Sequence, residues 1–324
     1  MMKYIKNILS VLVVLLIGYF VYKNVDLEEL KKINLETIIY LFLLYVAFFT
    51  IVTIPLKYIL RSLNYNIPIS KIFAVTIISN LFNLALPARG GTIYRGVYFK
   101  KYFNLSLTEY FSISYLLSLG GLFTVGLYSV ILLLLGQNLV TNIKIGLLTS
   151  GIIFCLFPFL GLFFPKVLLK LSQKFKKNID EKVDWSKVRS SRNVIMTLCG
   201  YFCSMTVYWV RIHIICSIFF KEISIEATLA LTCLNLAINI IPILPGNLGI
   251  KEASFAGILS MMGLSYELGL LVALIDRGMQ IITLGLFSSF FFVLEKEYLL
   301  LTKILSSNNS GETPEEILEN LTDK

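Results

Sequence analysis

The sequence predicts an all-α polytopic membrane protein with six full transmembrane helices, two re-entrant helical hairpins and an inverted-topology internal repeat. Three observations support this fold class: the apolar composition, the placement of the basic residues, and a turn rich in proline and glycine that occurs twice. Of the 324 residues, 56% are hydrophobic and 15% are charged, whereas soluble domains are about 45–50% apolar. This excess excludes a cytosolic enzyme, a disordered chain and a secreted disulfide scaffold.

Six apolar runs are long enough to cross a bilayer, which takes about 20 residues per helix. They cover residues 5–22, 37–60, 107–135, 142–164, 193–220 and 267–294. The first run follows Lys3 and Lys6, and no small-residue cleavage site comes after it. We therefore interpret this run as a retained signal anchor.

Two further apolar stretches, 71–86 and 226–244, contain asparagines and run into turns rich in proline and glycine. The segments after the turns, 93–103 and 253–262, are too short to span a membrane. We expect each stretch and its following segment to form a re-entrant hairpin, which enters and leaves on one side. The residues expected at the hairpin tips are Pro87, Gly90, Gly91, Pro245, Gly246 and Gly249.

The basic residues favour this threading, because cytoplasmic segments carry an excess of Lys and Arg. Re-entrant hairpins put Lys100, Lys101 and the basic segment 166–192 in the cytoplasm, together with both termini. If residues 71–86 crossed fully, Lys100 and Lys101 would lie outside. Few basic residues are left on the opposite side, namely Lys23, Lys31, Lys32, Lys144 and Lys221.

The chain is predicted to hold a single transmembrane domain over residues 1–305, followed by a polar acidic tail over 306–324 that we expect to be disordered. Repeat A covers about 37–136 and repeat B about 193–294. Between them, the basic segment 166–192 is amphipathic and is expected to lie along anionic lipid headgroups. Nothing in this segment requires a nucleic acid partner.

The repeat is visible as matched residues around the two turns. Ala74, Thr76 and Asn83 match residues 156 positions later, and Pro87, Gly91, Glu109 and Gly120 match residues 158 positions later. Three full crossings separate the hairpins, so the second hairpin is inverted relative to the first. Many secondary transporters have this architecture, with broken helices that meet near the bilayer midplane.

Seven ionisable residues fall at membrane depth: Arg89, Arg95, Arg211, Lys251, Glu252, Asp276 and Arg277. Charges at that depth cost about 2.5–3.5 kcal/mol each on insertion scales and therefore indicate a functional site. The helices that restart after the turns also point positively polarised N-termini at the cavity, which favours anions. Two structural alternatives stay open: Arg89 and Arg95 snorkel to an interface, or Arg211 only pairs with Asp276. Because Asp276 and Arg277 are adjacent, we expect them to have different partners.

Other kinds of chemistry find little support in the sequence. There is no GxxxxGK[ST] phosphate loop, and the one histidine, His213, lies inside a predicted helix. The five cysteines fall within apolar runs and form no cluster with metal-ligand spacing. We expect no catalytic residues, no metal and no cofactor.

Two tracts carry a resemblance to a known family. Residues 83–95, Asn-Leu-Ala-Leu-Pro-Ala-Arg-Gly-Gly-Thr-Ile-Tyr-Arg, and residues 245–252, Pro-Gly-Asn-Leu-Gly-Ile-Lys-Glu, resemble the motifs of a flippase-like integral membrane family. That family is related to the transmembrane part of lysylphosphatidylglycerol synthase, and the resemblance covers roughly residues 5–295. It implies a multi-pass protein of the prokaryotic plasma (inner) membrane.

The resemblance also implies headgroup recognition by Arg89, Arg95, Glu252 and Arg277. Two features depart from the family pattern. Thr92 stands where an acid often follows the glycine, and residues 112–118 lack the charged cluster that is common there. No soluble aminoacyl-transferring domain is visible, so lipid lysylation by this chain alone is not expected.

The leading hypothesis is a lipid translocase that moves an anionic lipid between leaflets: phosphatidylglycerol, an aminoacylated derivative or a polyprenyl-phosphate-linked lipid. Arg89, Arg95, Arg277 and Lys251 are the expected headgroup-binding residues, since guanidinium groups suit bidentate contact with phosphate. Glu252, Asp276 and Arg211 are the expected proton-coupling or ion-pair residues.

Three alternatives remain open at this stage. They are an integral-membrane transferase in polyprenyl-linked glycan synthesis, an accessory subunit of an envelope-synthesis complex, and a transporter of soluble ions. The expected partners are membrane lipids with an anionic headgroup and, for the first two alternatives, envelope-synthesis enzymes.

Overall fold

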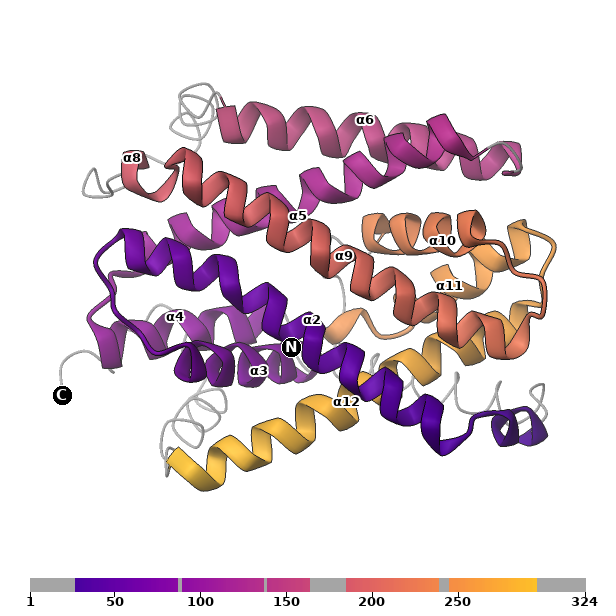
Figure 1. Cartoon of the computed structure of the whole chain (residues 1–324), viewed down its shortest axis with the longest axis horizontal. Coiled ribbons are helices and arrows are strands. Elements are labelled where there is room, and N and C mark those ends of the chain that lie inside the picture. Colours follow the sequence, from indigo (N-terminus) through magenta and orange to yellow (C-terminus); the bar gives the residue numbers. More distant parts are fainter. Residues whose placement is uncertain (1–26, 87–88, 137–138, 164–184, 239–244, 296–324) are drawn as a thin grey trace, which may run out of the picture.

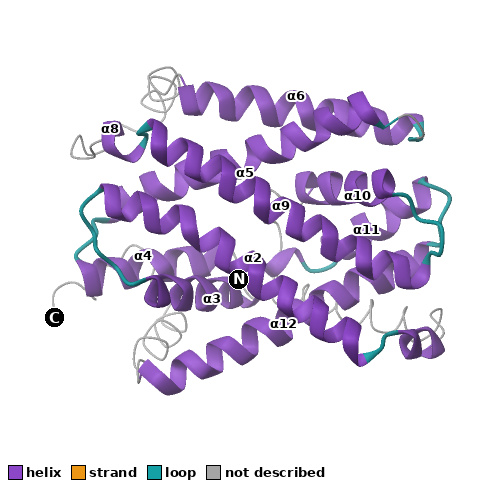
Figure 2. Cartoon of the chain, in the orientation of Figure 1, coloured by secondary structure: helices purple, strands orange, loops and turns teal. Residues whose placement is uncertain are grey.

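The structure, a computed structural model, describes residues 27–86, 89–136, 139–163, 185–238 and 245–295. Over these ranges helices joined by loops make up the chain, with no strand (Figure 2). Four sequence predictions lie outside the described residues: the crossing at 5–22, the tip residue Pro87, most of the segment 166–192, and the tail 306–324.

Five described helices are long and apolar enough to cross a membrane. They are α2 (Leu35–Ser62), α5 (Leu107–Leu135), α6 (Thr141–Phe163), α9 (Ser191–Phe219) and α12 (Tyr266–Glu295). At 1.5 Å per residue they exceed the hydrocarbon core of about 30 Å, and they coincide with five of the predicted crossings. The chain is therefore a multi-pass membrane protein.

The long helices begin at residues that favour helix starts. The side chain of Asn34 accepts a hydrogen bond from the Thr37 backbone N–H, which begins α2. Ser106 and Glu109 form a capping box at the start of α5, and Ser190 caps α9 by accepting from Asn193. These side chains satisfy backbone N–H groups that have no partner within the helix.

Four shorter helices flank the two predicted turns. They are α3 (Ile69–Ala85), α4 (Gly90–Phe103), α10 (Ile225–Ile238) and α11 (Ile250–Met261). The longest, α3, has 17 residues and is about 26 Å long, so none of them spans the hydrocarbon core alone. Helix α3 packs against α4, and α10 packs against α11. Their re-entrant placement in a bilayer stays a prediction.

Helices at matched positions in the two halves make matched contacts. Helix α2 packs on α3 as α9 packs on α10, and α3 packs on α12 as α10 packs on α5. In Figure 1, α3 and α4 lie in the left half, α10 and α11 lie in the right half, and α2 and α9 run in opposite directions. Short elements complete the described chain: η1 (Leu27–Lys32), α8 (Trp185–Val188) and η3 (Pro245–Asn247).

The two turns meet in the middle of the molecule. Gly246, in η3, has a φ of +57°, and a Cβ built there would lie 3.0 Å from the Leu84 carbonyl oxygen at the end of α3. Only glycine fits both this conformation and this contact. The contact brings the end of α3 and the residues before α11 to one place.

Candidate functional site

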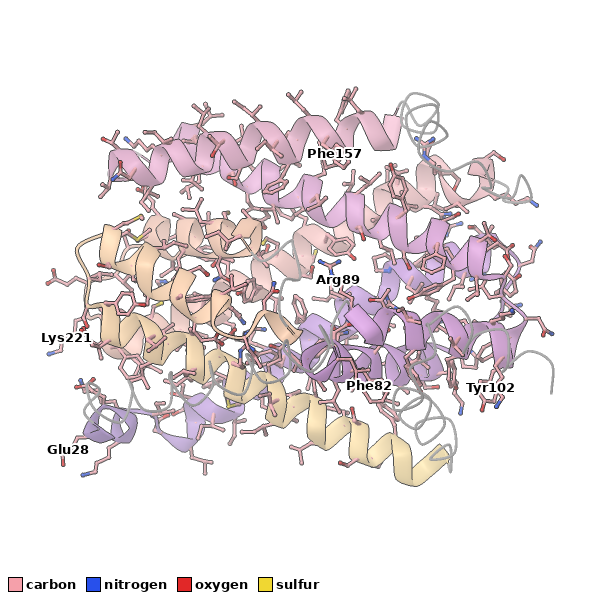
Figure 3. All side chains as sticks on the ribbon, turned by 180° about the vertical axis from the view of Figure 1, so that it is seen from behind. Glu28, Phe82, Arg89, Tyr102, Phe157 and Lys221 are labelled. Carbon is pink, nitrogen blue, oxygen red and sulfur yellow. The ribbon has the colours of Figure 1, made fainter. Side chains whose placement is uncertain are left out.

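A cavity of about 410 Å³ lies where the two turns meet. Leu84 and Arg89 line it from the first turn, and Gly246 and Asn247 line it from the second. The remaining walls come from α2, α5, α9, α10, α11 and α12. Figure 3 shows Arg89 at the centre of the molecule, between the two pairs of short helices. The basic side chains that line the cavity are Arg89, Arg211, Lys251 and Arg277.

The backbone of the first turn brings α4 very close to α3. A Cβ at Gly91 would lie 1.7 Å from the Ser79 carbonyl oxygen, so this crossing requires glycine. The Asn83 side chain accepts a hydrogen bond from the Thr92 N–H at 3.2 Å. Arg89, just before α4, has a left-handed backbone with φ 57° and ψ 44°. A non-glycine residue in this region is uncommon, and such strain concentrates at functional sites.

Arg95 lies on α4 and points toward α5. Its Nε donates to the Tyr110 hydroxyl at 2.9 Å, and that hydroxyl donates to the Thr92 carbonyl at 2.8 Å. Arg95 is not among the residues that line the cavity. However, Tyr201 of α9 lies within electrostatic range of both Arg95 and Arg89. The structure therefore places Arg95 beside the cavity and Arg89 in its wall.

Asp276 is the centre of a buried ionic network. It is 0% exposed and pairs with Arg211 at 2.8 Å and with Lys251 at 2.6 Å. The Tyr45 hydroxyl donates to the same carboxylate at 2.7 Å. The Arg211 guanidinium also stacks over the rings of Tyr45 and Tyr208, 3.7 and 4.8 Å from their centroids. One carboxylate thus connects α2, α9, α11 and α12.

A second buried pair holds the turn before α11. Glu252 forms an ion pair with Arg277 and accepts a hydrogen bond from the Gly249 N–H at 2.8 Å. Arg277 Nη2 donates to the Gly246 carbonyl at 3.1 Å. Glu252 is 1% exposed and Arg277 is 6% exposed. Both side chains therefore hold the backbone of the turn in place, and each also neutralises the charge of the other.

The structure agrees with two expectations about these charges. Asp276 and Arg277 have different partners, because adjacent helical residues point in different directions. Arg211 pairs with Asp276, although it also lines the cavity. Lys251 and Arg277 each contact a carboxylate and the cavity at once. Headgroup binding by Arg89, Arg95, Lys251 and Arg277 stays a prediction.

Several cavity residues were not predicted from the sequence. Tyr45, Tyr201, Tyr208, Asn235 and Gln280 all line the cavity. One signal was available for two of them: Tyr45 and Tyr201 are 156 positions apart, the same offset as in the first part of the repeat. Gln280 follows Arg277 by three residues and so shares its face of α12.

The arrangement suits binding of an anion, because basic side chains stand in a largely apolar wall. The network of Arg211, Lys251, Arg277, Asp276 and Glu252 carries one net positive charge, and Arg89 adds another. In a medium of low dielectric constant, excess charge interacts far more strongly than it does in water. The cavity volume lies within the range of small-molecule sites, about 300–1,000 Å³.

Comparison with known proteins identifies the family. The chain matches the family described as lysylphosphatidylglycerol synthase TM region over residues 7–288. This match includes both turns and every residue that lines the cavity. No curated protein and no solved structure matches the chain. The chain therefore belongs to the family of the lysylphosphatidylglycerol synthase TM region.

Proposed function

We propose that this protein is a lipid translocase that moves an anionic lipid, such as phosphatidylglycerol or a polyprenyl-phosphate-linked lipid, between the leaflets. The observation that carries the proposal is a central cavity with four basic side chains, in a membrane protein of a lipid-synthase family. The headgroup occupies the cavity, and the acyl or prenyl chains stay in the bilayer. A volume of about 410 Å³ suits a headgroup.

Under this proposal, the substrate phosphate binds where basic side chains outnumber carboxylates. Arg89 is exposed at the cavity, and the network behind it has one more cation than carboxylates. Arg277 already spans Glu252 and the Gly246 carbonyl, so it presents a fixed guanidinium. A phosphate beside Arg277 meets a largely buried network with one net positive charge, and this attraction is stronger in a site of low dielectric constant than in water.

The proposal includes six crossings and two re-entrant hairpins that enter from opposite sides. The short lengths of α3, α4, α10 and α11 support it, as does the contact between the two turns. Unpaired backbone groups at membrane depth are tolerated where they line a cavity. The matched contacts of the two halves are those expected of a transporter in which one half rocks against the other.

The charges at the two ends of the molecule support the same threading. Figure 1 shows α2, α4 and α6 ending at one end, where α3, α5 and α9 begin. The described basic residues of that end are Lys57, Arg61, Lys71, Lys100, Lys101, Lys187, Arg189 and Arg192, and its described acidic residues are Glu109 and Glu295, the last residue of α12. The other end has fewer described basic residues, namely Lys31, Lys32, Lys144 and Lys221, beside the acidic residues Glu28, Glu29, Glu36, Glu222, Glu226 and Glu267. The first end is therefore assigned to the cytoplasm.

The proposal is tested in proteoliposomes with acyl-labelled lipids and an impermeant quencher that reports the outer leaflet. We expect wild-type protein to move phosphatidylglycerol, and Arg89→Ala and Arg277→Ala to slow this movement by about tenfold or more, since each removes a charge-assisted contact. Thr149→Ala, on the exposed face of α6, is the control and should leave the rate unchanged. Equal rates in wild-type and both arginine variants would refute the site. Covalently modified lipid in the vesicles would indicate the transferase instead.

A further inference from the structure

Two side chains of the cavity wall have polar groups that make no hydrogen bond to the described residues. Other neutral polar groups of the wall are used within the protein: Thr124 donates to the Gly120 carbonyl at 2.8 Å, and Ser204 donates to the Tyr201 carbonyl at 3.0 Å. The Asn235 amide donates to Ser254 at 2.7 Å. Within the described ranges, neither the Gln280 amide nor the Tyr201 hydroxyl makes a hydrogen bond.

Each of these groups lies beside an arginine of the candidate site. Gln280 is three residues after Arg277 and four after Asp276, so it lies one turn further along the same face of α12. Tyr201, on α9, lies within electrostatic range of Arg89 and Arg95. An anion held by these arginines would bring its neighbouring substituents within reach of both groups.

Gln280 is not required to fill its place in the wall. Leu122 of α5 is the matched residue 158 positions earlier, and it also lines the cavity. An apolar side chain therefore suits a wall position of this kind. A glutamine amide has two donors and an acceptor, and leaving them unpaired away from water is unfavourable. A ligand that pairs with them removes this penalty.

Tyr201, like Gln280, has a matched residue in the other half of the chain, and this residue is Tyr45. The two tyrosines are 156 positions apart and both line the cavity, but the Tyr45 hydroxyl is committed to Asp276 at 2.7 Å. At matched places, therefore, one hydroxyl holds the ionic network and the other faces the cavity. The second is available to a ligand.

We propose that Gln280 and Tyr201 determine specificity by hydrogen-bonding to hydroxyl groups of the headgroup, beside the phosphate that the arginines hold. The ligand class is an anionic lipid whose headgroup is a polyol, either glycerol or a ring polyol. The inference rests on the proposed function. A site built to hydrogen-bond a hydroxyl discriminates strongly against the analogue that lacks it, because its own polar groups are then left unpaired.

The test compares three lipids: phosphatidylglycerol, phosphatidylinositol, and phosphatidylpropanol, which keeps the phosphate but has no headgroup hydroxyl. Their binding is measured as thermal stabilisation of the purified full-length protein, and their movement is measured in proteoliposomes. We expect wild-type protein to prefer at least one polyol lipid over phosphatidylpropanol by about tenfold or more. Preference for phosphatidylglycerol or for phosphatidylinositol distinguishes glycerol from a ring polyol.

Gln280→Leu and Tyr201→Phe should each reduce this preference while leaving phosphatidylpropanol binding within about twofold of wild type. Thr124→Val is the matched control, because its hydroxyl is already used within α5, and it should keep the wild-type preference. The inference is overturned if wild-type protein shows no preference in binding, or if both variants weaken all three lipids equally. Binding with a hydroxyl preference but no movement of any lipid would overturn the proposed function and leave the inference standing.

Discussion

Glu252 and Arg277 show how one buried pair can serve both structure and ligand binding. Both side chains lie within the protein, both contact the backbone of the turn before α11, and Arg277 also lines the cavity. A phosphate at the cavity would share Arg277 with Glu252. Arg277 thus has a structural role that is separable, in principle, from its contact with a ligand.

Arg277→Ala should lower the free energy of unfolding by about 3–5 kcal/mol, because it leaves the Glu252 carboxylate buried without its counter-charge. The double variant Glu252→Met/Arg277→Met should recover much of this loss, since no charge is then left unpaired. Thermal unfolding of purified protein in detergent measures both. A double variant as unstable as Arg277→Ala would show that the pair is needed for its backbone contacts and not only for its charges. In either case the double variant should not move lipid.

Tyr65 ties the loop after α2 to the start of α5. Its hydroxyl donates to Glu109 at 3.0 Å, the same carboxylate that accepts from Ser106 in the capping box. Burial, then the hydrogen bond to Glu109 and the charge of that carboxylate, raise the pKa of Tyr65 to about 12. The phenol of an unfolded chain titrates near pH 10. The contact therefore stabilises the fold fully below about pH 10 and is lost as the pH rises through about 12.

Tyr65→Phe should lower the free energy of unfolding by about 0.5–1.5 kcal/mol, the usual contribution of one hydrogen bond. Because the phenol of the wild-type protein stays protonated, this difference should be constant between pH ~7 and ~9. Chemical denaturation at several pH values measures it. A difference that shrinks across this range would contradict the assigned contact with Glu109.

At the scale of elements, the close approach of α4 to α3 depends on Gly91. Gly91→Ala should destabilise the protein strongly and abolish lipid movement, since its Cβ would lie 1.7 Å from the Ser79 carbonyl. Gly257→Ala, in α11, is the matched control because a Cβ there meets nothing within 4 Å. That change should be neutral or stabilising by up to about 1 kcal/mol, as alanine is the better helix former. Unfolding curves and transport rates of the two variants measure these effects. A fully active Gly91→Ala protein would refute the close crossing of α3 and α4.

The sequence was sufficient to predict the long helices but not how they pack against one another. Five long apolar runs became α2, α5, α6, α9 and α12, because hydrophobic length reports a spanning helix directly. The pairing of Arg211 with Asp276 was one of the alternatives that the sequence left open. The contacts of Lys251 and Tyr45 with Asp276 were not, since they depend on how four helices pack together. Gln280 was missed because a neutral amide does not stand out in an apolar run.

At the scale of the whole molecule, the threading predicts which loops face which side. Figure 3 shows Lys221 and Glu28 at one end and Tyr102 at the other. In a protein whose five cysteines are replaced, Lys221→Cys should react in whole cells with a membrane-impermeant maleimide. Lys101→Cys should react only after the membrane is opened. Labelling of Lys101→Cys in intact cells would show that the first hairpin crosses fully, which would refute its re-entrant placement.

The buried ion pairs belong to one half of the molecule, and this has an energetic consequence. The positions matched to Lys251, Asp276 and Arg277 in the first half are Ile93, Ser118 and Leu119, which carry no charge. Two identical halves would make the states open to either side of the membrane equal in free energy. Here two ion pairs hold α11 of the second hairpin against α12, and a third joins α12 to α9. Under the proposed translocase function, the substrate-free protein is therefore expected to be mostly open toward the cytoplasm.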